Sequence, residues 1–112
     1  MDIGERFIAR SAAEWRTWLE ENHAIRRDIW LILYKKGTGE TGVQYEEAVE
    51  EALCFGWVDS QMKSVDSQSY ALRFSPRRKT SNWSAANRVL AARLIKEGRM
   101  TEAGLAVLPG DL

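Results

Sequence analysis

The residues whose types and spacing could do chemistry lie between positions 54 and 88. A basic run, Arg77, Arg78 and Lys79, is followed by a polar segment in which Ser81, Asn82 or Ser84 can cap a helix. Arginine presents a fixed fork of N–H donors that fits carboxylate and phosphate groups. The first N–H groups of a helix carry partial positive charge that suits an anion. The stretch therefore predicts an anion-binding surface, with a solvated basic loop as the alternative.

Two alternating segments before the basic run predict a β-hairpin. Residues 57–63 and 70–75 alternate in polarity around a short polar connection at residues 64–69, and successive side chains of a strand point to opposite faces. If the apolar faces meet one core, charge collects on the other face beside Trp57. That face is then expected to carry Asp59, Gln61, Lys63 and Arg73. Asp59 would orient the arginines or bind a ligand amine; the structural alternative is that it pairs with Arg73 across the strands.

These features together define one predicted ligand site on the hairpin and the following helix start. Arginines would hold an anion, and tryptophan could stack on a planar or cationic group. The last two members of the set lie one helical turn beyond Ser84 and could add donors. The candidate ligand-binding residues are Trp57, Asp59, Lys63, Arg73, Arg77, Arg78, Trp83, Ser84, Asn87 and Arg88.

Several motifs in the same region resemble a known family. GWVDSQ, RFSPRRKTSNWSAANR and EGRMTEAG are similar to the YdeI/OmpD-associated (bacteriocin-protection) family over residues 55–104. The resemblance implies a small bacterial α+β protein linked to tolerance of bacteriocins or antimicrobial peptides, with no defined biochemical activity. Members of that family continue past the position where this chain ends in LPGDL. The resemblance thus predicts a single domain over residues 1–112 without a C-terminal helical segment.

Length and composition are those of one small globular domain. The chain has 112 residues, of which 45% are hydrophobic and 29% charged. Lys plus Arg and Asp plus Glu both number 16, so no net charge attracts nucleic acid or anionic lipid. The one cysteine excludes an internal disulfide, and no N-terminal apolar run resembles a signal peptide or a membrane span. We expect a cytoplasmic location, no membrane span and no specific nucleic-acid partner; the sequence does not indicate the oligomeric state.

The fold class expected from the pattern is α+β: a single small domain with an antiparallel sheet and helices packed on one face. A short strand at residues 7–8 should precede a helix from a Ser11/Glu14 capping box to about His23. Residues 29–34 should form a central strand and residues 45–53 an amphipathic helix. A further helix should start within residues 81–84 and continue to about Gly98. The predicted core is Trp18, Leu19, Trp30, Ile32, Val49, Leu53, Leu72, Phe74, Leu90 and Leu94.

The other reactive residue types favour structural roles. Cys54 should be a buried small hydrophobe, and His23 should lie at a helix end. Four glutamates, Glu46, Glu47, Glu50 and Glu51, should form a solvated acidic face of the second helix. With one histidine in the chain, we expect no metal and no cofactor.

The favoured function is a small binding or stress-tolerance protein that takes a small anionic ligand or a peptide. One alternative is an enzyme of unknown reaction, in which Asp59 acts as general base and the arginines stabilise an anion. The sequence offers no nucleophile with its base, which argues against catalysis. The other alternative is weak, non-specific nucleic-acid binding through residues 73–79 and Trp83.

Overall fold

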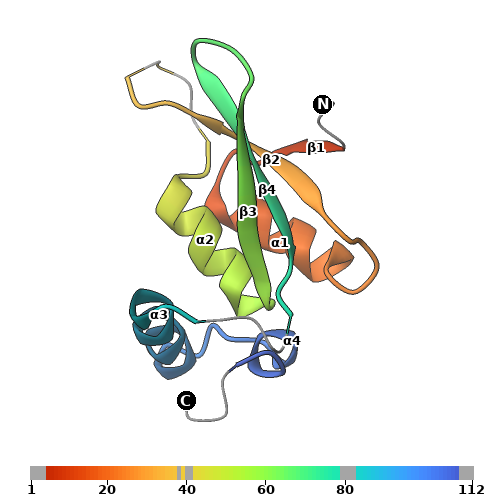
Figure 1. The fold of residues 1–112 in the computed structure, drawn as a ribbon, viewed down its shortest axis with the longest axis vertical. Helices are drawn as coiled ribbons and strands as arrows, with labels where there is room; N and C mark the ends of the chain where they lie inside the picture. Colours follow the sequence, from red (N-terminus) through yellow and green to blue (C-terminus); the bar gives the residue numbers. More distant parts are fainter. Residues whose placement is uncertain (1–4, 38, 40–41, 79–82, 109–112) are drawn as a thin grey trace.

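The computed structural model describes residues 5–37, 39, 42–78 and 83–108. Strands and helices alternate in the first half, and a hairpin then precedes two further helices (Figure 1). The elements of this part of the chain are β1 (Arg6–Ile8), α1 (Ala12–Asn22), β2 (Ile29–Tyr34), α2 (Tyr45–Cys54), β3 (Trp57–Ser64), β4 (Ser69–Pro76), α3 (Ala85–Lys96) and α4 (Glu102–Leu105).

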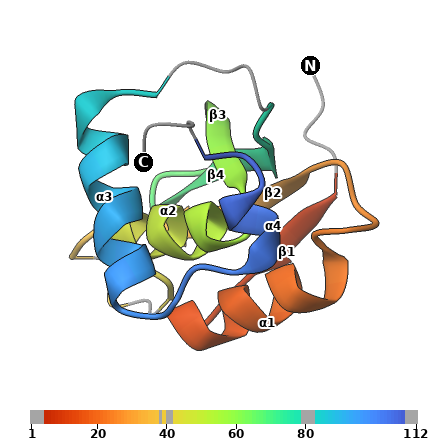
Figure 2. The same cartoon turned by 90° about the horizontal axis from the view of Figure 1, so that it is seen from below.

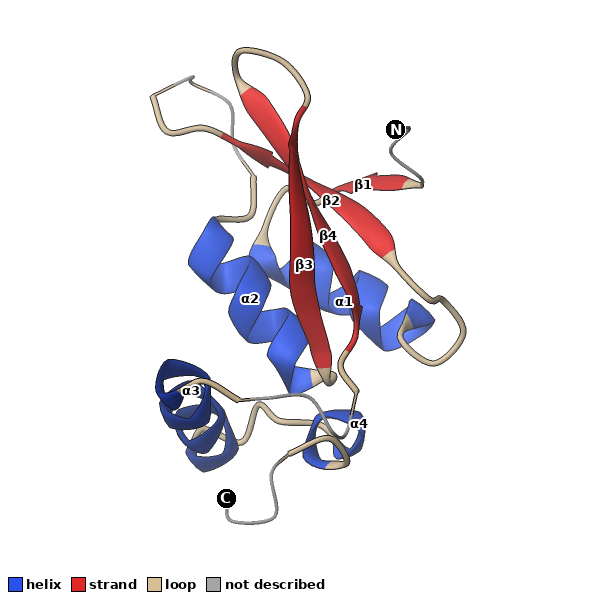
Figure 3. Ribbon diagram, viewed as in Figure 1, coloured by secondary structure: helices blue, strands red, loops and turns tan. Residues whose placement is uncertain are grey.

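The strands form one sheet in the order β1-β2-β4-β3. The β2–β4 and β4–β3 pairs are antiparallel, whereas β1 and β2 are parallel because α1 connects them as a crossover. Helices α1 and α2 lie behind the sheet in Figure 1, and α3 and α4 lie below its lower end. Figure 2, from below, shows α1 and α2 on the same side of the strands, and Figure 3 separates helices and strands by colour. The predicted α+β class with helices on one face is therefore confirmed.

The helix ends are set by local hydrogen bonds. The Ser11 hydroxyl accepts from the Glu14 N–H at 3.2 Å and begins α1, while the Glu14 carboxylate accepts from the Arg10 N–H rather than completing the box at Ser11. Gly56 follows α2 with φ +75°, a conformation that favours glycine, and lets the chain reverse into β3. At α3, Ser84 is the cap, which is one of the three caps that the sequence allowed, and the helix begins at Ala85. Lys79, Ser81 and Asn82 lie outside the described residues.

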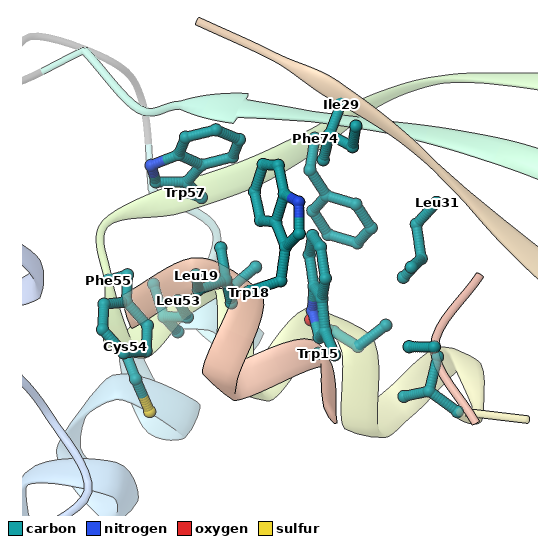
Figure 4. Close-up of a cluster of buried hydrophobic side chains, with 14 of the residues drawn as sticks. Trp15, Trp18, Leu19, Ile29, Leu31, Leu53, Cys54, Phe55, Trp57 and Phe74 are labelled. Carbon is teal, nitrogen blue, oxygen red and sulfur yellow. The ribbon is translucent and has the colours of Figure 1, made fainter. Parts of the chain in front are cut away.

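The main core is aromatic and lies between the sheet and helices α1 and α2 (Figure 4). Trp15, Leu19 and Phe74 are fully buried there, with the Trp15 ring stacked on Trp18 at a centroid distance of 5.5 Å. Among the predicted core residues, Val49 and Leu90 are half-buried and the others are buried. Trp30 and Ile32 belong to a second, smaller cluster with Ala71, because alternation turns them to the opposite face of β2.

A β-bulge in β3 corrects the predicted strand faces. Asp59 pairs with Phe74, but Gln61 pairs with Arg73, so Ser60 is an extra residue in the ladder. Trp57 and Asp59 therefore face the main core, whereas Lys63 and Arg73 face the opposite side. The prediction that Asp59 shares a face with Arg73 is wrong, because the extra residue interrupts the alternation of side chains between the two faces of β3.

Candidate functional site

The chain comes closest to a built polar site where the base of the hairpin meets the start of α3. We call this place the Arg77 crevice and define it by Trp57, Asp59, Arg77, Trp83 and Asn87. Arg77 is only 8% exposed, and its guanidinium carbon lies 4.2 Å from the centroid of the Trp83 ring. The Arg77 N–H also donates to the Gly56 carbonyl at 2.7 Å. The arginine is thus fixed in place by the backbone at one end and by a cation–π contact at the other.

Two opposing effects act on the ionisation of the Arg77 guanidinium in the crevice. Burial lowers the pKa of Arg77, and the nearby Asp59 carboxylate acts in the opposite direction. The free space between Asp59, Asn87 and the apolar wall is about 10 Å³, which is room for about one water molecule. A ligand must therefore contact the rim of the crevice unless side chains move.

Other predicted ligand residues lie close in the chain to the residues that define the crevice. Arg78 is exposed, Asn87 and Arg88 are half-buried, and the Ser84 hydroxyl accepts from the Asn87 N–H at 3.1 Å. Trp83 is half-buried beneath Arg77, and no described residue accepts a hydrogen bond from its buried indole N–H.

Two predicted members do not join this group. Lys63 and Arg73 lie on the opposite face of the sheet, where Arg73 donates from Nε and Nη2 to Asp28 Oδ2 at 3.0 and 2.7 Å. The predicted cross-strand pair of Asp59 with Arg73 is therefore wrong, and Asp28 is the partner. Asp28 lies just before β2, in a segment that the hairpin pattern alone does not connect to β4.

A cluster of ion pairs joins three helices and the turn after α3, and sequence reasoning missed it. We call it the Arg–Glu clasp: Arg16, Glu50, Glu51, Arg93 and Arg99. Arg16 Nη1 lies 2.8 Å from Glu51 Oε1, and Arg99 Nη2 lies 3.0 Å from Glu51 Oε2. Glu50 accepts from Arg93 at 2.8 Å and from Arg99 at 3.1 Å. The clasp connects α1, α2 and α3 through the face of α2 that was expected to contact solvent.

The predicted solvated face of α2 is thus only half correct. Glu46 and Glu47 are exposed, but Glu51 is 8% exposed and Glu50 is half-buried. The sequence contains one indication that Glu51 is buried. Glu51 lies directly before Ala52 and three residues after Ala48, which places it at the border of the apolar face of the helix.

Cys54 and His23 have the structural environments that their sequence context predicted. Cys54 is fully buried, and burial raises the pKa of its thiol although a hydrogen bond with Arg16 opposes that rise. Its carbonyl accepts from the Thr101 N–H and hydroxyl, which connects α2 to the start of α4. His23 ends α1, with Nδ1 at 2.7 Å from the Leu19 carbonyl. Within the described ranges, no group of three acidic, histidine or cysteine side chains could hold a metal ion.

The clasp predicts acid-sensitive stability. Burial of Glu50 opposes its ionisation, but hydrogen bonds from Arg93 and Arg99 outweigh burial and lower its pKa. A lowered folded-state pKa stabilises the fold above the ordinary carboxyl value of about 4.3, and this contribution is lost as pH falls through the folded-state pKa. The free energy of unfolding, measured in urea from pH 7 downwards, should therefore decline below about pH 4.3.

Glu50→Gln should flatten that decline, and Glu46→Gln, which changes an exposed residue of the same helix, should not. Some decline should persist in Glu50→Gln, because hydrogen bonds from the Gln68 and Ser69 N–H groups also lower the pKa of Asp66. Equal acid sensitivity in native and Glu50→Gln proteins would contradict the assignment.

The fold and the site define a small α+β domain in which a buried arginine stacks on tryptophan at the base of a β-hairpin. The chain belongs to the family described as Domain of unknown function (DUF8412), which matches residues 7–107. No curated protein and no solved structure matches the chain. In the described part of the chain, no helix has the length and apolar character needed to cross a membrane.

Proposed function

We propose that this protein is a small bacterial binding protein that holds an anionic ligand at the rim of the Arg77 crevice. The observation that supports the proposal is the burial of the Arg77 guanidinium against Trp83, beside the start of α3. An anion at the rim would be attracted by the arginines and by the partial positive charge of the first N–H groups of α3. Arg78 and Asn87 are the side chains that we expect to contact the ligand.

The resemblance of residues 55–104 to bacteriocin-protection proteins extends this proposal to a stress-tolerance role. Under that proposal, the ligand is a phosphate- or carboxylate-bearing molecule or peptide. The enzyme alternative has less support, because the crevice beside Asp59 has room for about one water molecule rather than a substrate. The nucleic-acid alternative also has less support, since Arg77 already covers the Trp83 ring that would stack on a base.

An anion that binds the folded state should raise the melting temperature by mass action. Phosphate at about ten times its dissociation constant adds about 1.4 kcal/mol, which corresponds to a rise of several degrees for a domain of this size. The experiment compares melting in phosphate and chloride at matched ionic strength. Arg78→Ala should lose most of the phosphate-specific rise, whereas Arg27→Ala, another exposed arginine remote in sequence, should keep it.

Arg78 is preferred to Arg77 for this test, because removing the buried arginine would destabilise the fold by itself. An equal rise in Arg78→Ala and native proteins, or no phosphate-specific rise in the native protein, would refute anion binding at this rim.

A further inference from the structure

A second surface, lined by none of the residues that define the Arg77 crevice, lies between the edge strand β1 and helix α1. It is a groove of about 340 Å³ lined by Phe7, Ala13, Glu14, Thr17, Trp18 and Glu21. We call it the β1–α1 groove. Figure 2 shows β1 and α1 beside each other at the end of the sheet away from α3.

The floor of the groove is aromatic and rigid. The Phe7 ring lies 5.9 Å from Trp18 and 6.3 Å from Trp15. Trp18 is in turn packed edge-on against Trp57 at 5.8 Å. Rings fixed in this way present an apolar floor and a π face that attracts cations.

The rim of the groove is acidic. Glu14, Thr17, Trp18 and Glu21 have the i, i+3, i+4, i+7 spacing of one helix face, which places the two carboxylates about 10 Å apart along α1. Glu21 is exposed and forms no ion pair with any described residue, and Glu14 accepts only from the Arg10 N–H. No basic side chain lines the groove, and Arg6 lies on the other face of β1, opposite Trp30.

The free edge of β1 adds a backbone recognition element. β1 is the end strand of the sheet, and the Trp30 N–H donates to the Glu5 carbonyl. Because backbone groups alternate along a strand, those of Arg6 and Ile8 point away from β2 toward the free edge. A chain in extended conformation could pair with this edge and place alternate side chains over the groove.

We propose that the β1–α1 groove binds a basic segment of a partner protein in extended conformation. A lysine or arginine side chain fits both parts of the groove, since its apolar stem can lie on Phe7 and Trp18 while its charged group reaches Glu14 or Glu21. Charge complementarity favours a basic segment, because the residues that line the groove include two carboxylates and no basic side chain and would repel an acidic segment. The site is independent of the proposed anion site and would persist if that site proved wrong.

The test measures fluorescence anisotropy of a short labelled peptide in which lysine alternates with valine, with a glutamate–valine peptide as the comparison. The native protein should bind the lysine peptide and not the glutamate peptide. Glu14→Gln with Glu21→Gln should weaken binding by roughly five- to tenfold, since two exposed ion pairs contribute about 0.5–0.7 kcal/mol each. Glu46→Gln with Glu102→Gln removes the same charge from exposed helix positions outside the groove and should leave the affinity unchanged.

Thr17→Arg provides a second variant that does not depend on the stability of the helix cap at Glu14. It places a positive charge in the middle of the groove and should abolish binding of the lysine peptide. Proton exchange of the Arg6 and Ile8 amides should also slow when the peptide is bound. The proposal is overturned if the native protein does not bind the lysine peptide, if both double variants weaken binding equally, or if sedimentation shows that the groove instead holds a second copy of the chain.

Discussion

Trp15→Ala is expected to lower the free energy of unfolding by about 3–5 kcal/mol, the largest effect of any single change considered for this protein. The Trp15 side chain is 0% exposed and contacts both neighbouring layers of the core. Its ring is stacked on Trp18 and lies 5.2 Å from Phe74 of β4. Its indole N–H donates to the Ala48 carbonyl of α2 at 3.0 Å. One side chain thus connects α1, α2 and the sheet, so its removal leaves a cavity and deletes the hydrogen bond that links α1 to α2.

Urea denaturation at constant pH measures the loss. Trp15→Phe keeps the aromatic contact but removes the hydrogen bond, and it should cost less than the alanine variant while remaining folded. Val89→Ala is the matched control, because Val89 is an apolar residue 71% exposed on α3 and should change stability by less than about 0.5 kcal/mol. A loss below about 1 kcal/mol for Trp15→Ala would show that α1 packs against the sheet through other residues.

The elements that local sequence determines were predicted well. The apolar run at residues 29–34 became the interior strand β2, and the spacing of Ala48, Ala52 and Leu53 became the buried face of α2. Ser11 and Gly56 act at helix ends through their own hydrogen bonding and backbone conformation. Each of these features depends on residues a few positions apart, which a sequence pattern records directly.

The features that were missed depend on contacts between distant segments. The bulge at Ser60 changes which residues share a face, and nothing in the composition of residues 57–63 indicates an extra residue in the ladder. The partner of Arg73 is 45 positions away at Asp28, and the partner of Glu51 is 48 positions away at Arg99.

In the candidate site, too, the local features were predicted and the tertiary contacts were missed. That Arg77, Arg78 and the start of α3 lie near one another follows from their closeness in the chain. The burial of Arg77 does not follow, because it requires the Trp83 ring to pack over a guanidinium that the sequence presents as part of a basic run. Under the proposed function, the buried Arg77 therefore positions its surroundings, and we expect its exposed neighbour Arg78 to contact the ligand.

Glu51→Ala is the second change with a large expected effect, a loss of about 2 kcal/mol in the free energy of unfolding. Removing one member of a buried ion pair costs about 3–5 kcal/mol when the charge of the other member stays buried and uncompensated. The side chains of Arg16 and Arg99 are 29% and 31% exposed, so water recovers part of that loss. Glu51 itself is 8% exposed and holds one arginine with each carboxylate oxygen. In its absence Arg16 keeps Glu20 and Arg99 keeps Glu50 as ion-pair partners, which further limits the loss.

Glu46→Ala is the matched control, because it removes the same charge from an exposed position of the same helix. It should change stability by less than about 0.5 kcal/mol. Glu51→Gln should fall between the two, since the amide oxygen can still accept from one arginine. Because the clasp joins α2 to the turn after α3, Glu51→Ala should also speed hydrogen exchange at Thr101, whose N–H donates to the Cys54 carbonyl. If Glu51→Ala and Glu46→Ala have equal stability and equal exchange, Glu51 contributes nothing to docking of the C-terminal helices, and the other contacts of these helices hold them against α2.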